Sequence, residues 1–472
     1  MISMKLSEIC SVIGAEYDGE DKEINGISTD SRAVGENELF IPIVGEKYDA
    51  HEFLNGISCC AASLCERDCG RTSFSLIRVK STVEALGKIA AHNLKKAGVK
   101  LCVSLTGSVG KTTTKEMCAL VVSQKYNTFK TEGNLNNHIG VPKTLLSLDE
   151  SHEALVCEMG MSNRGEIAYL TRLVESDVAI ITNIGNSHIE NLKTRENIAA
   201  AKLEILEGLK KDGTLIVNGD EPLLENLNIT QRIIRFGFSE QCEVRAENIN
   251  THPDGVDFDC ICFGKACHAF IPVPGRHNVA NALCAVAAGA AVGIDVETAC
   301  NSLANYVPSG MRQKIYSKNG TTVIADCYNA GIESMTASIR MLSELSCKGR
   351  RIESMCASLE ALRDMQGDRV SVAVLGDMLE LGEVSELFHQ RVGEKAVECG
   401  INAVFTYGNR ARIISETALK NGISQAVHFE TREELVEKLS EYSRRENSVI
   451  LFKASRGMEF EKLISMSGLT QD

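Results

Sequence analysis

The sequence lacks several patterns that would assign the protein to a membrane or to nucleic acid. It has no apolar run of about 18 or more residues and therefore predicts no transmembrane helix. Its first residues, MISMKLSEICSVIG, are amphipathic and do not have the basic-then-apolar build of a signal peptide. A basic surplus is also missing, since the formal net charge is −13, which argues against a nucleic-acid binder. We therefore expect a cytoplasmic protein with neither a membrane insertion nor a nucleic-acid partner.

Two cofactor patterns are also absent. No dinucleotide fingerprint G-x-G-x-x-G occurs, so the sequence does not indicate NAD. The 18 cysteines include a cluster at Cys59, Cys60, Cys65 and Cys69, but its spacing does not match the paired CxxC pattern of zinc sites. In a cytosolic protein these cysteines are expected to be reduced thiols, many of them buried as small apolar side chains.

The chain is long enough for two or three domains, with 472 residues of which 44% are hydrophobic and 24% charged. Short apolar segments alternate with helical segments, which is typical of mostly parallel sheets covered on both faces. The strand candidates are 101–107, 154–160, 177–183 and 214–219 in the middle of the chain, and 321–327, 370–377, 402–408 and 448–455 in its last part. We predict an α/β protein of three domains: a small N-terminal α/β module (1–82), a central parallel sheet of the ATPase type (83–314) and a C-terminal open sheet (315–472).

The run TGSVGKTTTKE at 106–116 carries the clearest chemical signal. It joins a predicted strand to a predicted helix, and backbone N–H groups of such a glycine loop point at bound phosphates. Lys111 would add a full positive charge, and the hydroxyl of Thr112 is placed to bind Mg²⁺. The spacing, with Gly107 and Gly110, is the shorter G-x-x-G-K-T. The alternative interpretation is an ordinary strand-to-helix turn with a surface lysine.

Polar residues follow two other predicted strands. Glu158 ends one strand and His188 follows another, and ligands bind at the carboxyl ends of strands in open α/β sheets. A carboxylate beside a phosphate site suits a hard cation such as Mg²⁺. Taken singly, Glu158 could equally cap a helix, His188 could be structural, and Lys202 in AAAKLEILEGL could be a solvated lysine.

Motifs along essentially the whole chain resemble the Mur ligase family, whose members build the stem peptide of peptidoglycan. Four of them are most similar to the family members that join D-alanyl-D-alanine to UDP-N-acetylmuramoyl-tripeptide: GNLNNHIGVP, EMGMSNRGEI, DCYNA and LGDMLELGE. Besides the phosphate loop, the segments that carry the resemblance are 28–53, 132–146, 158–167, 182–190, 200–206, 218–222, 274–285, 308–313, 326–335, 375–383 and 453–460.

The resemblance implies ATP and Mg²⁺ as cofactors and assigns roles to individual residues. Lys111, His188 and Lys202 would be catalytic. Thr112 and Glu158 would hold one Mg²⁺, and His188 and a carbamylated Lys202 a second. The implied ATP-binding residues are Gly107, Ser108, Val109, Gly110, Lys111, Thr112 and Thr113 of the loop, Asn278 and Asn281 at the adenine, Arg312 at the phosphates and Asp326 at the ribose. The implied substrate-binding residues are Thr29, Asp30, Ser31 and Arg32 at the uridine diphosphate, Asn134, Asn136 and Asn137 in the cleft, and Tyr328, Asn329, Lys453, Ser455 and Arg456 in the C-terminal domain.

The resemblance also implies a reaction in which a tripeptide carboxylate attacks the γ-phosphate of ATP and the dipeptide amine then attacks the acyl phosphate. The expected partners are these two substrates, with the chain itself a monomer and the third tripeptide residue, diaminopimelate or lysine, left open. Two other functions also remain open: a related ligase for another amino acid, such as a diaminopimelate- or lysine-adding enzyme or a folylpolyglutamate synthase, and a catalytically silent nucleotide-binding partner of cell-wall proteins.

Two local features depart from the family pattern. NAGI stands at 329–332 where the family has Asn-Ala-Asn-Pro, which puts the local turn and a dipeptide contact in question. The segment 332–343 also matches 352–363 at seven of twelve positions, which indicates a local tandem duplication. We predict that the second copy is a tolerated insertion.

Overall fold

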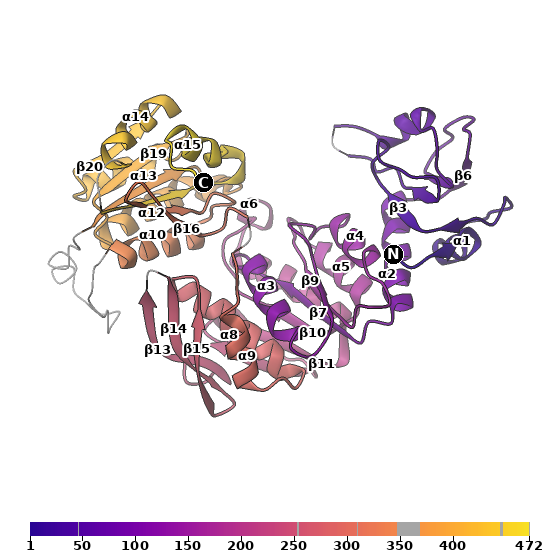
Figure 1. Cartoon of the computed structure of the whole chain (residues 1–472), viewed down its shortest axis with the longest axis horizontal. Coiled ribbons are helices and arrows are strands. Elements are labelled where there is room, and N and C mark those ends of the chain that lie inside the picture. The colour runs from indigo at the N-terminus through magenta and orange to yellow at the C-terminus, as the bar shows by residue number, and fades with distance from the viewer. Residues whose placement is uncertain (46, 253, 309, 347–368, 444–446, 472) are drawn as a thin grey trace.

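The computed structural model describes residues 1–471 other than 46, 253, 309, 347–368 and 444–446. The chain forms three α/β bodies, each built on its own main sheet (Figure 1). The N-terminal and C-terminal bodies lie at opposite ends of the molecule, and the central body lies between them (Figure 1). No described helix is both long enough and apolar enough to cross a membrane.

The N-terminal body contains a four-stranded parallel sheet in the order β3-β4-β5-β6 and a two-stranded antiparallel pair, β1 and β2. Its strands are short, and α1 packs against the long helix α2 (Thr82–Ala97) of the central body. Its elements are β1 (Met4–Lys5), α1 (Leu6–Ile13), β2 (Glu23–Ile24), β3 (Gly26–Ser28), β4 (Glu38–Phe40), the 3₁₀ helix η1 (Ala50–Gly56), β5 (Ala62–Cys65) and β6 (Ser75–Arg78).

The central body is a nine-stranded sheet in the order β15-β14-β13-β12-β11-β10-β7-β9-β8. From β8 to β13 neighbouring strands are parallel, and β7 and β9 are buried at every position, as expected for strands covered on both faces. The strands are β7 (Leu101–Thr106), β8 (Thr128–Lys130), β9 (Ala154–Glu158), β10 (Ser176–Ile181), β11 (Leu209–Asn218), β12 (Arg232–Gly237), β13 (Val244–His252), β14 (Gly255–Cys262) and β15 (Lys265–Ile271).

Helices cover both faces of this sheet. Helix α8 is rich in alanine and buried along most of its length, which allows close packing against the phosphate-loop helix α3. The helices of the central body are α2 (Thr82–Ala97), α3 (Lys111–Val122), α4 (Gly140–Leu146), α5 (Glu166–Val174), α6 (Ile189–Leu192), α7 (Arg195–Leu203), α8 (Arg276–Ala291) and α9 (Val296–Leu303), with 3₁₀ helices η2 (Glu204–Gly208) and η3 (Pro222–Leu224).

The C-terminal body is a six-stranded sheet in the order β16-β17-β21-β18-β19-β20, parallel except for the edge strand β16. Its strands are β16 (Lys314–Lys318), β17 (Thr321–Ala325), β18 (Val370–Gly376), β19 (Ala403–Tyr407), β20 (Gln425–Phe429) and β21 (Ser448–Lys453). Its helices are α10 (Ile332–Ser346), α12 (Ser385–Glu398), α13 (Arg412–Lys420), α14 (Arg432–Ser443) and α15 (Phe460–Met466), with 3₁₀ helices η4 (Gly382–Val384) and η5 (Arg456–Met458).

The predicted α/β class with parallel sheets is confirmed, and each strand candidate coincides with an observed strand. The domain boundaries remain predictions: 82/83 falls at the beginning of α2, and 314/315 falls within β16. The first copy of the repeat forms most of α10, whereas the second copy at 352–363 lies outside the described residues. At the NAGI departure the chain turns directly into α10, where the Ser334 hydroxyl exchanges hydrogen bonds with the backbone of Gly331.

Candidate active site

The phosphate loop connects β7 to α3 and needs its glycines for two different reasons. Gly110 has φ 78°, a left-handed conformation that costs a glycine little. A Cβ on Gly107 would lie 1.8 Å from the Thr182 hydroxyl, so only glycine fits against β10. The ammonium of Lys111 donates to the carbonyls of Gly107 at 2.8 Å and Ser108 at 3.3 Å. The loop therefore has the closed geometry in which backbone N–H groups can surround a phosphate.

Residues after β10 hold this loop in place. Asn183 accepts hydrogen bonds from the N–H groups of Ser108 (3.1 Å) and Val109 (3.0 Å) and donates to the Val109 carbonyl (2.8 Å). The Ser187 hydroxyl donates to the Ser108 carbonyl at 3.2 Å. These contacts join segments more than 70 residues apart. Asn183 was not predicted as a functional residue, although it lies in the segment 182–190 that carries the family resemblance.

Glu158 lies at the centre of a buried polar group beside the loop. Its carboxylate accepts hydrogen bonds from the Thr112 hydroxyl at 2.9 Å and the Asn136 amide at 2.8 Å. The ammonium of Lys115 lies 4.0 Å from Glu158, 3.2 Å from Glu116, and donates to the Thr131 carbonyl at 2.6 Å. Lys115 was not among the predicted site residues. Its place four residues after Lys111, one helical turn along α3, was the available signal.

His188 lies where the central and C-terminal bodies meet. Its backbone is left-handed, with φ 61°, and its Nδ1 is 3.0 Å from the carboxylate of Glu380 in the C-terminal body. Burial and the positive charge of Lys111 lower the pKa of His188, with Glu380 opposing the effect. Burial also lowers the pKa of Lys111.

Lys202 is an unusual lysine because its side chain is almost fully buried, with a relative exposure of 1%. Burial, together with repulsion from Lys111, lowers its pKa well below the ordinary lysine value. Among the described residues, no carboxylate opposes this shift. The side chain therefore favours a neutral amine.

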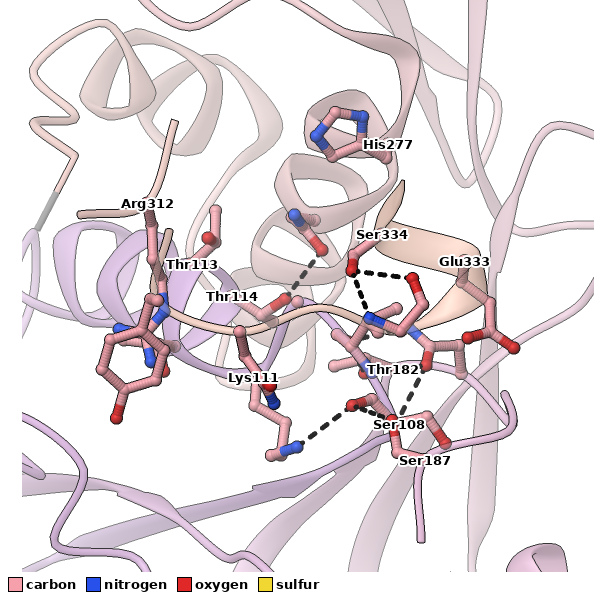
Figure 2. Close-up of a pocket in the computed structure, with 18 of the residues that line it drawn as sticks. Ser108, Lys111, Thr113, Thr114, Thr182, Ser187, His277, Arg312, Glu333 and Ser334 are labelled. Atoms are coloured by element: carbon pink, nitrogen blue, oxygen red, sulfur yellow. Dashed lines mark hydrogen bonds between the residues drawn. The ribbon is translucent and has the colours of Figure 1, made fainter. Parts of the chain in front are cut away.

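A cavity of about 590 Å³ lies between the central and C-terminal bodies (Figure 2). Most of the predicted site residues line this one cavity, although they come from distant parts of the sequence. The predicted residues that line the cavity are Ser108, Val109, Gly110, Lys111, Thr112, Thr113, Asn134, Asn136, Asn137, Glu158, His188, Asn278, Asn281, Arg312, Asp326, Tyr328, Asn329 and Lys453.

Further polar contacts line the cavity beside the loop and at the entry to the C-terminal body. The Asn278 amide donates to the Gln313 side chain at 2.7 Å, and Asn281 accepts from the Thr114 hydroxyl at 3.1 Å. The Arg312 guanidinium stacks 3.6 Å from the centroid of the Tyr328 ring. Gln313 and Thr114 were not predicted.

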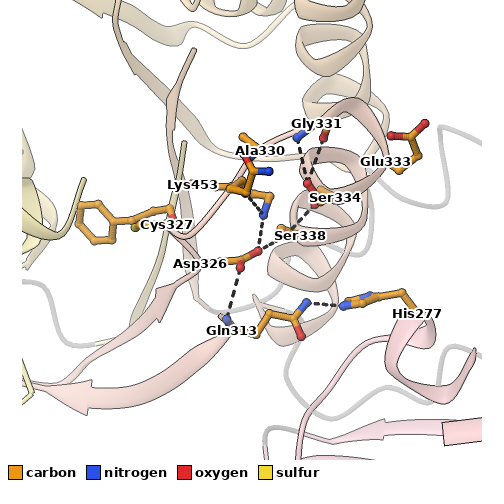
Figure 3. Close-up of polar contacts among 12 residues, drawn as sticks. His277, Gln313, Asp326, Cys327, Ala330, Gly331, Glu333, Ser334, Ser338 and Lys453 are labelled. Carbon is orange, nitrogen blue, oxygen red and sulfur yellow. Dashed lines mark hydrogen bonds and ion pairs between the residues drawn. The ribbon is translucent and has the colours of Figure 1, made fainter. Parts of the chain in front are cut away.

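Asp326 and Lys453, which were expected to make separate ligand contacts, form a buried ion pair in the C-terminal body (Figure 3). Asp326 also accepts from the Ser338 hydroxyl at 2.8 Å and from the Gln313 backbone at 3.3 Å. Lys453 donates to the Asn329 carbonyl at 3.2 Å. Both residues of the pair line the cavity.

Several predicted residues lie outside this cavity. Lys202 and Gly107 are adjacent to it but do not line it, and Ser455 is buried against the backbone of Leu379. Arg456 is largely exposed and pairs with Glu461 at 3.0 Å. The N-terminal body carries Thr29, Asp30, Ser31 and Arg32, where the Arg32 guanidinium holds the pKa of the Asp30 carboxyl well below its usual range. Their predicted roles remain untested predictions.

Comparison with known proteins identifies the family. The Mur ligase middle domain model matches residues 105–289, and the model of the Mur ligase glutamate ligase domain matches residues 347–456. A UDP-N-acetylmuramoyl-tripeptide–D-alanyl-D-alanine ligase of Bacillus subtilis is 39% identical over 454 residues, covering 94% of this chain and 93% of the relative. The chain belongs to the Mur ligase family.

Solved Mur ligase structures have the same fold. The MurF structure from Acinetobacter baumannii superposes with a TM-score of 0.88 at 28% identity, covering 99% of both chains. A MurF ligase from Thermotoga maritima in complex with ADP gives a TM-score of 0.81 at 26% identity, covering 93% of this chain and 96% of that one. Our Mur ligase is thus an ATP-dependent ligase of peptidoglycan precursor synthesis with the three-domain fold of these enzymes.

Proposed function

We propose that this Mur ligase joins D-alanyl-D-alanine to UDP-N-acetylmuramoyl-tripeptide, with ATP converted to ADP and phosphate. The observation that carries the proposal is the 39% identity to the Bacillus subtilis ligase across nearly the whole of both chains. The cavity supports it, because it has a phosphate loop on one side and polar groups of the C-terminal body on the other. A ligase of another amino acid would share the loop but is disfavoured by the 39% identity of this match.

The phosphoryl-transfer end of the cavity is formed by Lys111, Thr112 and the loop backbone. The loop N–H groups and Lys111 stabilise charge on the β- and γ-phosphates as a tripeptide carboxylate oxygen attacks the γ-phosphorus and ADP leaves. The dipeptide amine then attacks the acyl carbon of the resulting acyl phosphate, and phosphate leaves. Because His188 and Glu380 bring the two bodies together at this end, the site can exclude water from the acyl phosphate.

The donor set beside the loop fits Mg²⁺. Glu158 and Thr112 offer oxygen ligands 2.9 Å apart, and the phosphates of ATP would supply more. When bound, Mg²⁺ offsets phosphate charge and polarises the transferring group. The described residues contain no cluster of three or more His, Cys, Asp or Glu side chains that could hold a metal alone, which agrees with a metal that arrives with the nucleotide.

A second metal position involves His188 and Lys202. A carbamate forms when a neutral lysine amine attacks CO₂ and releases a proton, and it turns a cation into a carboxylate-like ligand. The lowered pKa of Lys202 favours the neutral amine that this step needs. Carbamylation of Lys202 is therefore part of the proposal.

We also propose that the uridine diphosphate group binds at Thr29–Arg32 and that the enzyme acts as a monomer in the cytoplasm. All cysteines that the structure describes are free thiols, which suits a reducing compartment.

Phosphate release with UDP-linked tripeptide and D-alanyl-D-alanine tests the function. We expect release only when both substrates and ATP are present, and loss of release in Lys111→Ala with an unchanged circular dichroism spectrum. Phosphate release with diaminopimelate, lysine or glutamate instead would point to a related ligase. No turnover with any acceptor, together with ATP binding, would point to a silent nucleotide-binding protein.

A further inference from the structure

Glu333, in the first turn of α10, connects the C-terminal body to the loop after β10. One of its carboxylate oxygens accepts two hydrogen bonds from Asn186, from the backbone N–H at 2.8 Å and from the side-chain amide at 2.6 Å. The carboxylate also packs on Gly185, where a Cβ would lie 2.8 Å from Glu333 and 3.1 Å from Ser108. Glu333 therefore lies directly beside the phosphate loop, on the side of the cavity away from Arg312 (Figure 2).

The second carboxylate oxygen of Glu333 has no hydrogen-bond partner among the described residues, although it is buried. An unsatisfied buried acceptor costs free energy, and a charged one costs more. Nor do neighbouring cations satisfy it. Arg195 is paired with Glu221 at 2.7 Å, and Arg391, which lines a second cavity with Glu333, is beyond ion-pair distance of it.

The position limits what can satisfy this oxygen. A carboxylate beside a loop that binds phosphates repels anionic ligands, so its natural complement is a cation or an N–H donor. If the proposed function holds, the dipeptide amine must approach the acyl phosphate that forms at this loop, and it gains positive charge as its nitrogen attacks. Glu333 lines the same cavity as Lys111, Ser108 and Asn329.

We infer that Glu333 binds the amino group of the incoming dipeptide. Its Asn186-bound oxygen fixes the carboxylate against the phosphate loop, and its free oxygen receives the N–H groups of the acceptor. The inference rests on the proposed function and assigns the amine end of the acceptor to α10, directly after the NAGI segment.

The test is a kinetic comparison of wild type with Glu333→Gln. Glutamine keeps an oxygen that can accept from Asn186 but replaces the free carboxylate oxygen with an NH₂ group. We expect the KM for D-alanyl-D-alanine to rise at least about tenfold, as for loss of a hydrogen bond to a charged group, while the KM values for ATP and UDP-linked tripeptide stay unchanged. An unchanged dipeptide KM, or an equal rise in all three, would overturn the inference.

Two controls separate binding from a purely structural role. Asn186→Ala removes the side-chain donor but keeps the carboxylate, whereas Glu333→Gln keeps the acceptor of that bond. A purely structural link would therefore impair Asn186→Ala and leave Glu333→Gln close to wild type in all three KM values. Propionyl-D-alanine, which is the dipeptide without its amine, should inhibit wild type and Glu333→Gln with the same inhibition constant.

If the variant does not fold, the wild-type enzyme alone still tests the inference. Inhibition by propionyl-D-alanine at concentrations near the dipeptide KM would refute a role for the amine in binding. A wild-type enzyme that does not use the dipeptide at all refutes the proposed function instead.

Discussion

Lys115 offers a direct test of how the buried polar group around Glu158 is stabilised. The Lys115→Met variant keeps a similar side-chain volume but removes an ammonium whose side chain is 1% exposed. Glu116 would retain Lys130 as a partner, whereas Glu158, itself only 2% exposed, would lose the ammonium that lies 4.0 Å away. Removing one partner from a buried charge pair costs about 3–5 kcal/mol, because the remaining charge stays buried.

Lys100→Met is the matched control in the same body. Lys100 pairs with Glu153 at 2.8 Å, closer than Lys115 is to Glu158, but its side chain is 66% exposed. Solvent screens an exposed pair, so its loss should cost little stability. Ranked by burial, Lys115→Met is the more destabilising variant, whereas ranked by ion-pair distance it is Lys100→Met.

Differential scanning calorimetry of the two variants gives the comparison. For a domain of this size the Lys115→Met loss corresponds to a fall in Tm of about 6–20 °C in the transition of the central body. The Lys100→Met transition should move by about 4 °C or less. Equal shifts in the two variants, or a larger shift for Lys100→Met, would refute the reasoning that burial decides the energetics here.

Three further outcomes are expected. Gly107→Ala places a methyl group against the Thr182 hydroxyl, so ATP affinity measured by calorimetric titration should fall at least about tenfold while the Tm of the C-terminal body is unchanged. Arg312→Lys keeps the charge but loses the planar stack on Tyr328, and the KM for ATP should rise about twofold to fivefold in initial-rate assays. In bicarbonate-free buffer the unfolded state binds a proton at Lys202 more readily than the folded state, so Tm should rise as pH increases toward the ordinary lysine pKa. Lys202→Met should flatten that slope, and a slope identical to wild type would contradict a lowered pKa.

Sequence reasoning predicted eight inner strands of the two large sheets because long stretches of them are buried on both faces. These strands are β7, β9, β10, β11, β17, β18, β19 and β21. Continuous apolar runs such as those at β7 and β10 have few other interpretations, and the glycine loop after β7 adds a second, independent signal. The antiparallel strands β13, β14 and β15 were not predicted. In β14 buried and partly buried positions alternate, so no continuous apolar run marks it.

Site residues that a local sequence pattern marks were predicted. Site residues that act by holding a distant segment of the chain were missed. Lys111 and Glu158 follow strand ends and could be found from local pattern. Asn183 and Glu333 act through hydrogen bonds to residues 75 and 147 positions away, which only the folded chain brings together. Asp326 and Lys453 were predicted as two ligand contacts, and their ion pair across 127 positions likewise follows from the pairing of β17 with β21.

The loop after β10 has a pharmacological consequence. Asn183 holds the phosphate loop, and three residues later Asn186 is held by Glu333 of the C-terminal body. The second cavity is lined by this loop, by Val109 of the phosphate loop and by Arg391, and Lys111 is not among its lining residues. A small molecule seated there would contact both bodies and could disturb the alignment of nucleotide and acceptor without occupying the ATP position. Inhibition from this cavity would therefore be noncompetitive with ATP, and a high nucleotide concentration would not relieve it.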